Sequence, residues 1–265
     1  MTRSVWLLGR PVAHSVSPAM HQAAYQALGE DLVYLAAEVG PEDLPTVLDG
    51  LLKLQALGIN LTIPLKQAVL PLLKRLDRRA RELGAVNCLR PCDGGWEGTN
   101  TDADGWLDSW REEVGQPLEG RRAIVLGWGG AARAVGTLLQ EQGARLQVLL
   151  RDPTRLKDSA SLQELATYLE PGAIVLNATP VGTQSEQSPV RWPDEVPQNL
   201  VACDLVYNPQ QTRFLLDARQ RGCATLGGLG MLVHQARRAI EWWTGKPADC
   251  AAVMRRAAEA QLSSM

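Results

Sequence analysis

The chain has 265 residues, of which 45% are hydrophobic and 21% charged, with a formal net charge of −2 and a sequence pI of about 6.0. A chain of this length and balance forms one large globular domain or two modest ones. It has no basic stripe and no apolar run near the roughly 20 residues that cross a bilayer, so we expect neither nucleic acid nor a membrane as a partner.

The cysteine count and the N-terminal stretch indicate a reduced, cytoplasmic protein. The five cysteines are an odd number, and the short apolar run at the N-terminus lacks the form of a signal peptide, so we expect no disulfide framework. Neither the cysteines nor the three histidines have the spacing of metal ligands. We therefore expect no bound metal.

The first hundred residues alternate short apolar runs with helix-length segments. Strands are predicted over residues 4–9, 32–39, 59–63, 85–91 and 95–100, the last two around a glycine-rich turn. Helices are predicted over residues 17–29, 41–58 and 64–73. In the first of these helices Ser17 is the expected cap, Pro18 follows in the first turn, and Gly29 ends it, as Gly58 is expected to end the second.

A second alternation starts near residue 102. Helices are predicted over residues 102–115, 130–143, 212–222, 231–245 and 250–262. Strands are predicted over residues 121–127, 144–150, 174–179 and 200–207, and residues 182–199 form one long loop. Because strands alternate with helices, we predict an α/β fold of two lobes with parallel sheets, the C-terminal helices packing on the first lobe. Trp242 and Trp243 are expected to pack between the lobes.

The turn Gly127-Trp128-Gly129-Gly130-Ala131-Ala132 fits the G-x-G-x-x-[G/A] pattern between a strand and a helix. Small residues there permit a tight turn and let the backbone approach a pyrophosphate, which the helix N-terminus binds with its amide groups. The alternative is a glycine-rich turn made only for packing. Trp128 either shields the pyrophosphate or packs on the other lobe, and the sequence does not decide between these roles.

Eight polar motifs then follow one another in a fixed order along residues 9–236. They are GRPVAHSVSPAMHQAAY, NLTIPLK, GAVNCL, GTNTDADG, GWGGAAR, NATPVG, DLVYNPQQT and GLGMLVHQA. This set closely resembles the shikimate dehydrogenase family. The resemblance implies a substrate-binding and catalytic domain of residues 1–101 plus 232–265 and a Rossmann-like, NADP-binding domain of residues 102–231. It also implies a monomer or homodimer in the shikimate pathway of chorismate and aromatic amino acid biosynthesis.

The same resemblance assigns the site residues. Lys66 and Asp102 match the catalytic pair, with Lys66 giving a proton to the nascent alkoxide when NADPH reduces 3-dehydroshikimate to shikimate. The positions that match substrate-binding residues are Ser15, Ser17, Asn60, Thr62, Asn87, Tyr207, Gly228 and Gln235, the two serines facing the carboxylate. The positions that match cofactor-binding residues are Gly127, Gly129, Gly130, Ala131, Arg151, Arg155, Thr179 and Met231.

Structural alternatives accompany several of these assignments. A lone lysine at a helix start is usually solvated, Asp102 also suits a helix N-cap, Ser17 suits a cap before Pro18, and Asn60 could satisfy a turn. Asn87 interrupts an apolar strand, so its burial requires hydrogen-bond partners. The competing functions are a quinate or dual quinate/shikimate dehydrogenase, with relaxed substrate or NAD use, and a regulatory protein that has lost its chemistry. Retention of both Lys66 and Asp102 argues against the second.

The stretch after the second strand of the nucleotide lobe bears on the choice of cofactor. An acidic residue there usually binds the ribose diol of NAD, whereas arginine accepts the extra phosphate of NADP. Arg151 and Arg155 occupy the two basic positions of NADP-dependent members, but Asp152 stands where those members carry threonine. Asp152 opposes the phosphate if it faces it, or only starts the turn before Pro153. We expect NADP to be preferred, by a reduced margin.

Overall fold

The computed structural model describes residues 2–264. The chain separates into two compact units: unit 1 runs to Gly105 and resumes at Val233, and unit 2 is Trp106–Leu232. Within the described residues no helix combines the length and apolar character needed to span a membrane. The five cysteines are all free thiols.

Unit 1 is built on a six-stranded sheet in the order β2-β1-β3-β5-β6-β4. Its strands are β1 Arg3–Gly9, β2 Leu32–Glu38, β3 Gly58–Leu61, β4 Arg75–Leu76, β5 Cys88–Cys92 and β6 Gly95–Thr99. Its helices are α1 Ser17–Leu28, α2 Leu44–Lys53, α3 Leu65–Ala68, η1 Leu70–Leu72, α4 Arg78–Leu83 and α10 Ala251–Leu262. Two helices, α5 Asp102–Glu113 and α9 Gly228–Thr244, belong partly to each unit.

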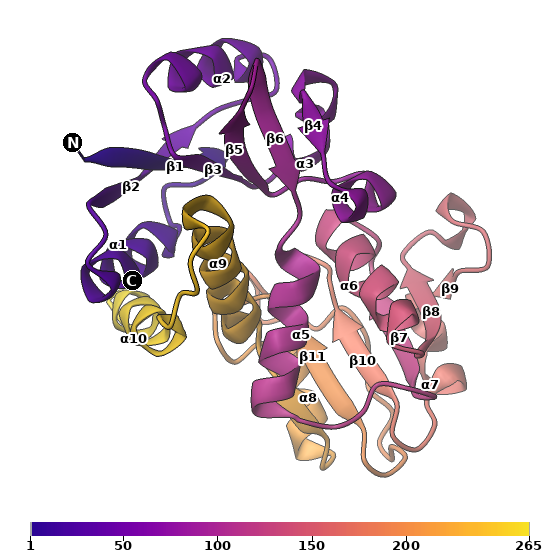
Figure 1. Cartoon of the computed structure of the whole chain (residues 1–265). Coiled ribbons are helices and arrows are strands. Elements are labelled where there is room, and N and C mark those ends of the chain that lie inside the picture. Colours follow the sequence, from indigo (N-terminus) through magenta and orange to yellow (C-terminus); the bar gives the residue numbers. More distant parts are fainter. Residues whose placement is uncertain (1, 265) are drawn as a thin grey trace. The chain divides into compact units, whose positions relative to one another are not determined.

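The unit 1 sheet is covered on both faces. One face packs against α2, whose Leu44, Leu48 and Leu51 join a core with Ile59 and Trp96. The other face carries α1 and the second half of α9, and α10 packs on α1 (Figure 1). Burial on both faces explains why β3 has no exposed residue.

Unit 2 is a six-stranded sheet in the order β12-β11-β10-β7-β8-β9, with all strands parallel. Its strands are β7 Arg122–Leu126, β8 Arg145–Leu150, β9 Ala160–Ser161, β10 Ile174–Asn177, β11 Val201–Asp204 and β12 Ala224–Leu226. Its helices are α6 Gly130–Glu141, η2 Pro153–Arg155, η3 Leu162–Glu164, α7 Leu165–Tyr168 and α8 Arg213–Gln220. Read from β9, this is the Rossmann order 3-2-1-4-5-6.

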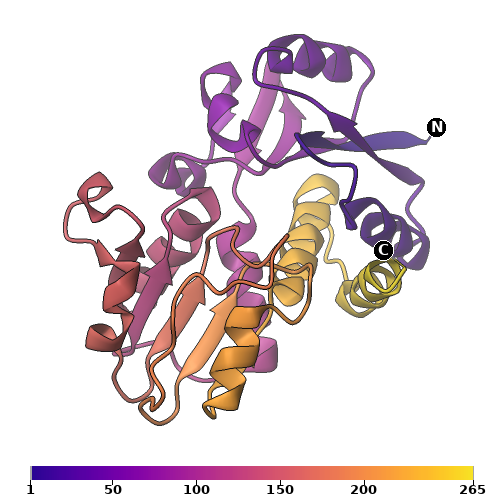
Figure 2. The same ribbon diagram turned by 180° about the vertical axis from the view of Figure 1, so that it is seen from behind.

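The two faces of the unit 2 sheet are covered differently. Helix α6 packs against β7 and β8 on one face. On the other face α8 and the loop of residues 182–199 lie over the strands (Figure 2), and Trp192 packs on Phe214 there with ring centroids 5.3 Å apart. The predicted α/β fold with a substrate-type lobe and a Rossmann-like lobe is confirmed, and residues 182–199 form the predicted irregular loop.

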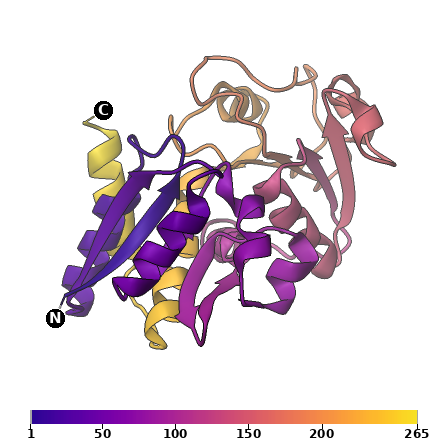
Figure 3. The same ribbon diagram turned by 90° about the horizontal axis from the view of Figure 1, so that it is seen from above.

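Besides the short strands β4, β9 and β12 and the helix α4, which were not predicted, four details differ from the expectations. The unit 1 sheet is mixed, because the tight turn after Cys92 makes β5 and β6 antiparallel. The pairing of β3 with β5 is also antiparallel. Figure 3 shows this hairpin beside α2. Helix α2 ends at Lys53, and Gly58 instead begins β3. The helix predicted over residues 64–73 divides at Val69, since Pro71 follows.

The fourth difference concerns the tryptophans of α9. Trp243 lies against Gly58 and donates its indole Nε1 hydrogen to Leu89 O at 2.9 Å. Trp242 lies under the guanidinium of Arg90, whose carbon is 4.3 Å from the ring centroid. These contacts lie inside unit 1, so they are not the packing between lobes that we expected.

Candidate active site

The predicted catalytic pair forms a close ion pair in unit 1. Lys66 Nζ lies 2.7 Å from Asp102 Oδ2, and the two side chains are 20% and 6% exposed. Lys66 sits on the short helix α3 just after β3, and its backbone carbonyl accepts from Val86 N at 2.8 Å. Asp102 opens α5. The pair is partly desolvated, so the alternative of a lysine that is merely solvated at a helix start does not describe Lys66.

Asn87 supports the carboxylate from its other side. Its Nδ2 donates to Asp102 Oδ1 at 2.7 Å and lies 3.0 Å from Thr101 Oγ1. The orientation of the amide is fixed, because its Oδ1 accepts from the backbone N–H of Thr101 at 2.8 Å. Asn87 is 2% exposed, so the partners that its burial requires are present in the protein itself.

Asn60 lies beside Asn87 across the β3–β5 pairing. It is 6% exposed, and its Nδ2 donates to the Asn87 carbonyl at 3.2 Å. Its Oδ1 accepts from the hydroxyl of Tyr34 at 2.8 Å. Asn60 is therefore a buried strand residue, and the alternative that it satisfies a turn is wrong. Thr62 follows β3 and packs on Gly9, where any Cβ would lie 2.2 Å from Thr62 Cγ2.

Gln235 on α9 approaches the same cluster through a close helix contact. A Cβ on Gly105 would lie 2.5 Å from Gln235 N, so only glycine lets α5 and α9 come this near. Gln235 Oε1 is 3.4 Å from Asn87 Nδ2. The structure thus brings together five of the predicted residues: Asn60, Lys66, Asn87, Asp102 and Gln235.

The two serines lie after β1, at the edge of the sheet where β3 also ends. Ser17 N donates to Ser15 Oγ at 3.2 Å, and Ser17 is 7% exposed. The N-cap of α1 is Val16 without a side-chain bond, so Ser17 does not cap the helix as expected. The carboxylate-binding role of both serines stays a prediction.

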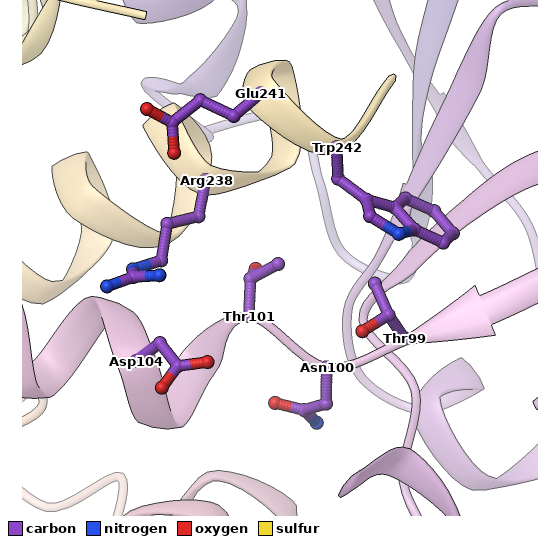
Figure 4. A pocket seen from close by; sticks show the side chains of 7 residues that line it. All are labelled: Thr99, Asn100, Thr101, Asp104, Arg238, Glu241 and Trp242. Carbon is purple, nitrogen blue, oxygen red and sulfur yellow. The ribbon is translucent and has the colours of Figure 1, made fainter. Parts of the chain in front are cut away.

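A separate cavity of about 320 Å³ opens beside the start of α5. It is lined by Thr99, Asn100, Thr101, Asp104, Arg238, Glu241 and Trp242. Figure 4 shows Arg238 pointing from α9 toward α5, where Asp104 lies. This cavity shares no residue with the predicted catalytic and substrate set, so we place the site at the cluster around Asp102.

In unit 2 the glycine turn has the geometry of an anion-binding loop. Gly127 has φ +88°, which favours glycine, and a Cβ there would lie 2.9 Å from Thr179 Cγ2. Gly129 caps α6 with an ordinary φ of −83°, and nothing lies within 4 Å of a Cβ built on it. Neither backbone strain nor packing requires glycine at 129, so the open space suits the close approach of a phosphate. Trp128, in the turn before α6, packs on Gly136 of that helix.

A buried acid holds the neighbouring loop in place. Asp204, 1% exposed at the end of β11, accepts from Asn177 Nδ2 at 3.0 Å, from Val206 N at 2.9 Å and from Thr212 Oγ1 at 2.6 Å. Burial raises the pKa of Asp204 to about 6, against the lowering by these three hydrogen bonds. Asn177 Oδ1 in turn accepts from both N and Oγ1 of Thr179, so this network sets the position of Thr179.

The charged stretch after β8 is exposed. Arg151, Asp152 and Arg155 all lie at the surface, before or within η2. Asp152 caps this turn: its Oδ1 accepts from Thr154 N at 3.1 Å and from Thr154 Oγ1 at 2.6 Å. These bonds, with Arg155 nearby, lower the pKa of Asp152. Asp152 therefore starts the turn before Pro153, which is the second of the two alternatives given for it above.

The remaining predicted residues, Tyr207, Gly228 and Met231, lie in unit 2. Gly228 N donates to Val206 O at 3.3 Å, and a Cβ on Gly228 would lie 2.5 Å from Leu205 O. The start of α9 therefore packs against the segment that carries Tyr207. Met231 is 8% exposed on the same helix. Their predicted contacts with substrate and cofactor stay predictions.

The sequence reasoning missed Tyr34, Asn177 and Asp204. Asn177 and Asp204 each end an otherwise apolar strand, and both are almost fully buried. A polar residue that closes a buried strand was the signal that could have indicated them. Tyr34 gave a weaker signal, since tyrosine is common in strands.

A Rossmann unit together with a substrate-type unit defines a dinucleotide-dependent oxidoreductase. Comparison with known proteins agrees with this class. Residues 7–89 match the family model of the shikimate dehydrogenase substrate binding domain, and residues 228–259 match that of the shikimate 5'-dehydrogenase C-terminal domain. A shikimate dehydrogenase (NADP(+)) of Methanopyrus kandleri is 40% identical, over 97% of this chain and 94% of its own length.

Solved structures give the same result. Shikimate 5-dehydrogenase from Thermus thermophilus, in complex with NADP(H) and shikimate, is 36% identical with a TM-score of 0.88, covering 98% of this chain and 100% of its own. Quinate dehydrogenase from Corynebacterium glutamicum, in complex with NAD, is 30% identical with a TM-score of 0.86 over 98% and 99% of the two chains. The chain belongs to the shikimate dehydrogenase family, as the motifs predicted.

Proposed function

We propose that the protein catalyses the reversible reduction of 3-dehydroshikimate to shikimate with NADPH, a step of chorismate and aromatic amino acid biosynthesis. The observation that carries this proposal is the Lys66–Asp102 pair inside a cluster of amide side chains, in a chain of the shikimate dehydrogenase family. Unit 1 binds the substrate in this scheme and unit 2 the cofactor. We place the protein in the cytoplasm as a monomer or homodimer.

Lys66 handles the proton. In reduction its ammonium donates a proton to the carbonyl oxygen as negative charge develops there, and in oxidation the neutral amine accepts the hydroxyl proton. Asp102 Oδ2 lies 2.7 Å from Nζ and fixes the direction of the ammonium. Lys66 is 20% exposed, so water can restore its proton after each turnover.

The amides and serines orient the substrate. Asn60, Thr62, Asn87 and Gln235 offer neutral hydrogen-bonding groups to ring hydroxyls, while Ser15 and Ser17 offer hydroxyl donors to the carboxylate. Neutral donors suit the ring hydroxyls, which carry no charge. Tyr207 and Gly228 complete the proposed substrate set.

The groups in unit 2 fit a phosphorylated dinucleotide. The open space over Gly129 admits a pyrophosphate at the N-terminus of α6, where Gly127, Gly130 and Ala131 keep the loop small. When bound, NADPH supplies the hydride. Arg151 and Arg155 would hold its extra phosphate, and Thr179 and Met231 would contact the nicotinamide half.

A steady-state assay of NADP⁺ reduction, followed by absorbance, tests the proposal with shikimate and quinate in parallel. We expect turnover with shikimate, a much lower kcat/KM with quinate, and a loss of turnover in Lys66→Ala with correct folding. Absence of turnover with shikimate would refute the proposal. Equal or higher kcat/KM with quinate would instead indicate the quinate-type activity, for which a similar fold is known.

A further inference from the structure

Asn60 of β3 contributes its side chain to the candidate site. Its amide is held by Tyr34 of β2, which is separated from β3 by the strand β1. The sheet order β2-β1-β3 puts Tyr34, Val5 and Gly58 in one row, and Asn60 follows Gly58 by two residues on the same face. Since Gly58 has no side chain, no side chain of β3 occupies that row. The Tyr34 hydroxyl lies 2.8 Å from Asn60 Oδ1.

The direction of the Asn60 amide follows from its two partners. The backbone carbonyl of Asn87 accepts only, so the group 3.2 Å from it must be Asn60 Nδ2. The Asn60 oxygen therefore faces Tyr34, and the Tyr34 hydroxyl must donate. Burial raises the pKa of Tyr34 well above its usual value, so the phenol keeps this proton. One N–H of Asn60 remains for a ligand.

Tyr34 is itself held rigidly. It is 4% exposed and stacks on the ring of His21, with centroids 3.9 Å apart and planes 9° from parallel. Burial lowers the pKa of His21 to about 3, so the stacked imidazole is neutral and adds no charge next to the site. The tyrosine therefore cannot leave Asn60 without disturbing a packed aromatic pair.

The contacts form one chain from Tyr34 to the catalytic pair. Tyr34 binds Asn60, Asn60 binds the Asn87 carbonyl, and Asn87 Nδ2 binds Asp102 Oδ1 at 2.7 Å, next to Lys66. We propose that Tyr34 is a positioning residue for substrate recognition, which acts through Asn60 by turning the amide so that its N–H, and not its oxygen, meets a hydroxyl oxygen of the ring. This inference rests on the proposed function.

The variant Tyr34→Phe tests it, because phenylalanine keeps the ring that stacks on His21 and removes only the hydroxyl. The Asn60 oxygen then loses its buried donor and the amide is held only by the 3.2 Å bond to the Asn87 carbonyl, so we expect the KM for shikimate to rise about tenfold, as for the loss of a donor to a buried acceptor. The KM for NADP⁺ and kcat should change by less than about twofold. Tyr25→Phe is the matched control: Tyr25 is equally buried and its hydroxyl lies 3.3 Å from His21 Nδ1, but it does not contact Asn60.

A double-mutant cycle separates positioning from a general loss of packing. In the Asn60→Ala background Tyr34→Phe should leave the KM for shikimate unchanged, since there is no amide left to orient. A tenfold rise in both backgrounds, an unchanged KM in Tyr34→Phe, or an equal rise in Tyr25→Phe would overturn the inference while the wild type still oxidises shikimate. A wild type inactive on shikimate would overturn the proposed function, and this inference with it.

Discussion

Asp204 offers a test of the energetics of unit 2 that is independent of catalysis. Asp204 is the last residue of β11, its carboxyl is buried, and burial raises the pKa of this carboxyl from 3.8 to about 6. Three donors, on Asn177, Val206 and Thr212, face it. The replacement Asp204→Asn keeps the shape and an acceptor oxygen but removes the titration, so wild type and variant should differ in how their stability depends on pH.

The sign follows from proton linkage. Because the pKa of Asp204 is higher in the folded than in the unfolded protein, the folded state binds more protons between about pH 4 and pH 6. The contribution of Asp204 to stability is therefore complete below pH 4 and is lost as the pH rises through 6. At about 1.4 kcal/mol per pKa unit, the rise from 3.8 to about 6 corresponds to roughly 3 kcal/mol.

Urea unfolding at pH 4, 5, 6 and 7 measures this effect. We expect the unfolding free energy of the wild type, relative to Asp204→Asn, to fall by roughly 2–3 kcal/mol between pH 4 and pH 7. Asp194→Asn is the control, because that side chain is 93% exposed and its one ion-pair distance, to Arg221, is 3.8 Å. The account of Asp204 would be refuted if the unfolding free energy of the wild type minus that of Asp204→Asn stayed constant with pH or increased as the pH rises.

Three further predictions concern the proposed catalytic and binding residues. Lys66→Ala should lower kcat by about 10²–10⁴-fold with a smaller change in KM, and an unchanged kcat would exclude Lys66 as the acid. Ser15→Ala and Ser17→Ala should each weaken shikimate binding by about 1–3 kcal/mol, and wild-type KM values in both would remove the carboxylate pocket. Asp152→Thr, which removes an exposed negative charge beside Arg151 and Arg155, should widen the preference for NADP⁺ over NAD⁺ in kcat/KM, and Arg151→Ala should collapse it; a wild-type preference for NAD⁺ contradicts the proposed arginine pair.

The regular elements of the fold were predictable because local signals agreed with them. Gly29 ends α1 in the left-handed conformation, as a glycine C-cap should, and Asp93 and Gly94 form the turn between β5 and β6. The strands β4, β9 and β12 were missed, since two or three residues show no periodicity. Their position is decided by pairing with neighbours rather than by local sequence.

The site was predictable to the extent that its residues stand in motifs. Lys66 and Asp102 were named from the sequence, and the structure places their charged groups 2.7 Å apart although 36 residues separate them. The assignment of Asp152 stayed open in the sequence, because a carboxylate before proline can cap a turn or face a ligand. Its bonds to Thr154 N and Oγ1 show the capping role.

The direction of each amide is the part that no sequence pattern carries. Asparagine has a donor end and an acceptor end, and which end faces a ligand depends on partners that the strand register supplies. Asn87 presents Nδ2 to Asp102 because Thr101 N occupies its oxygen, and Asn60 presents its nitrogen to the Asn87 carbonyl because Tyr34 occupies its oxygen. Asp102 consequently accepts on both oxygens, from Lys66 and from Asn87, and cannot turn away from the lysine without also breaking its 2.7 Å hydrogen bond with Asn87.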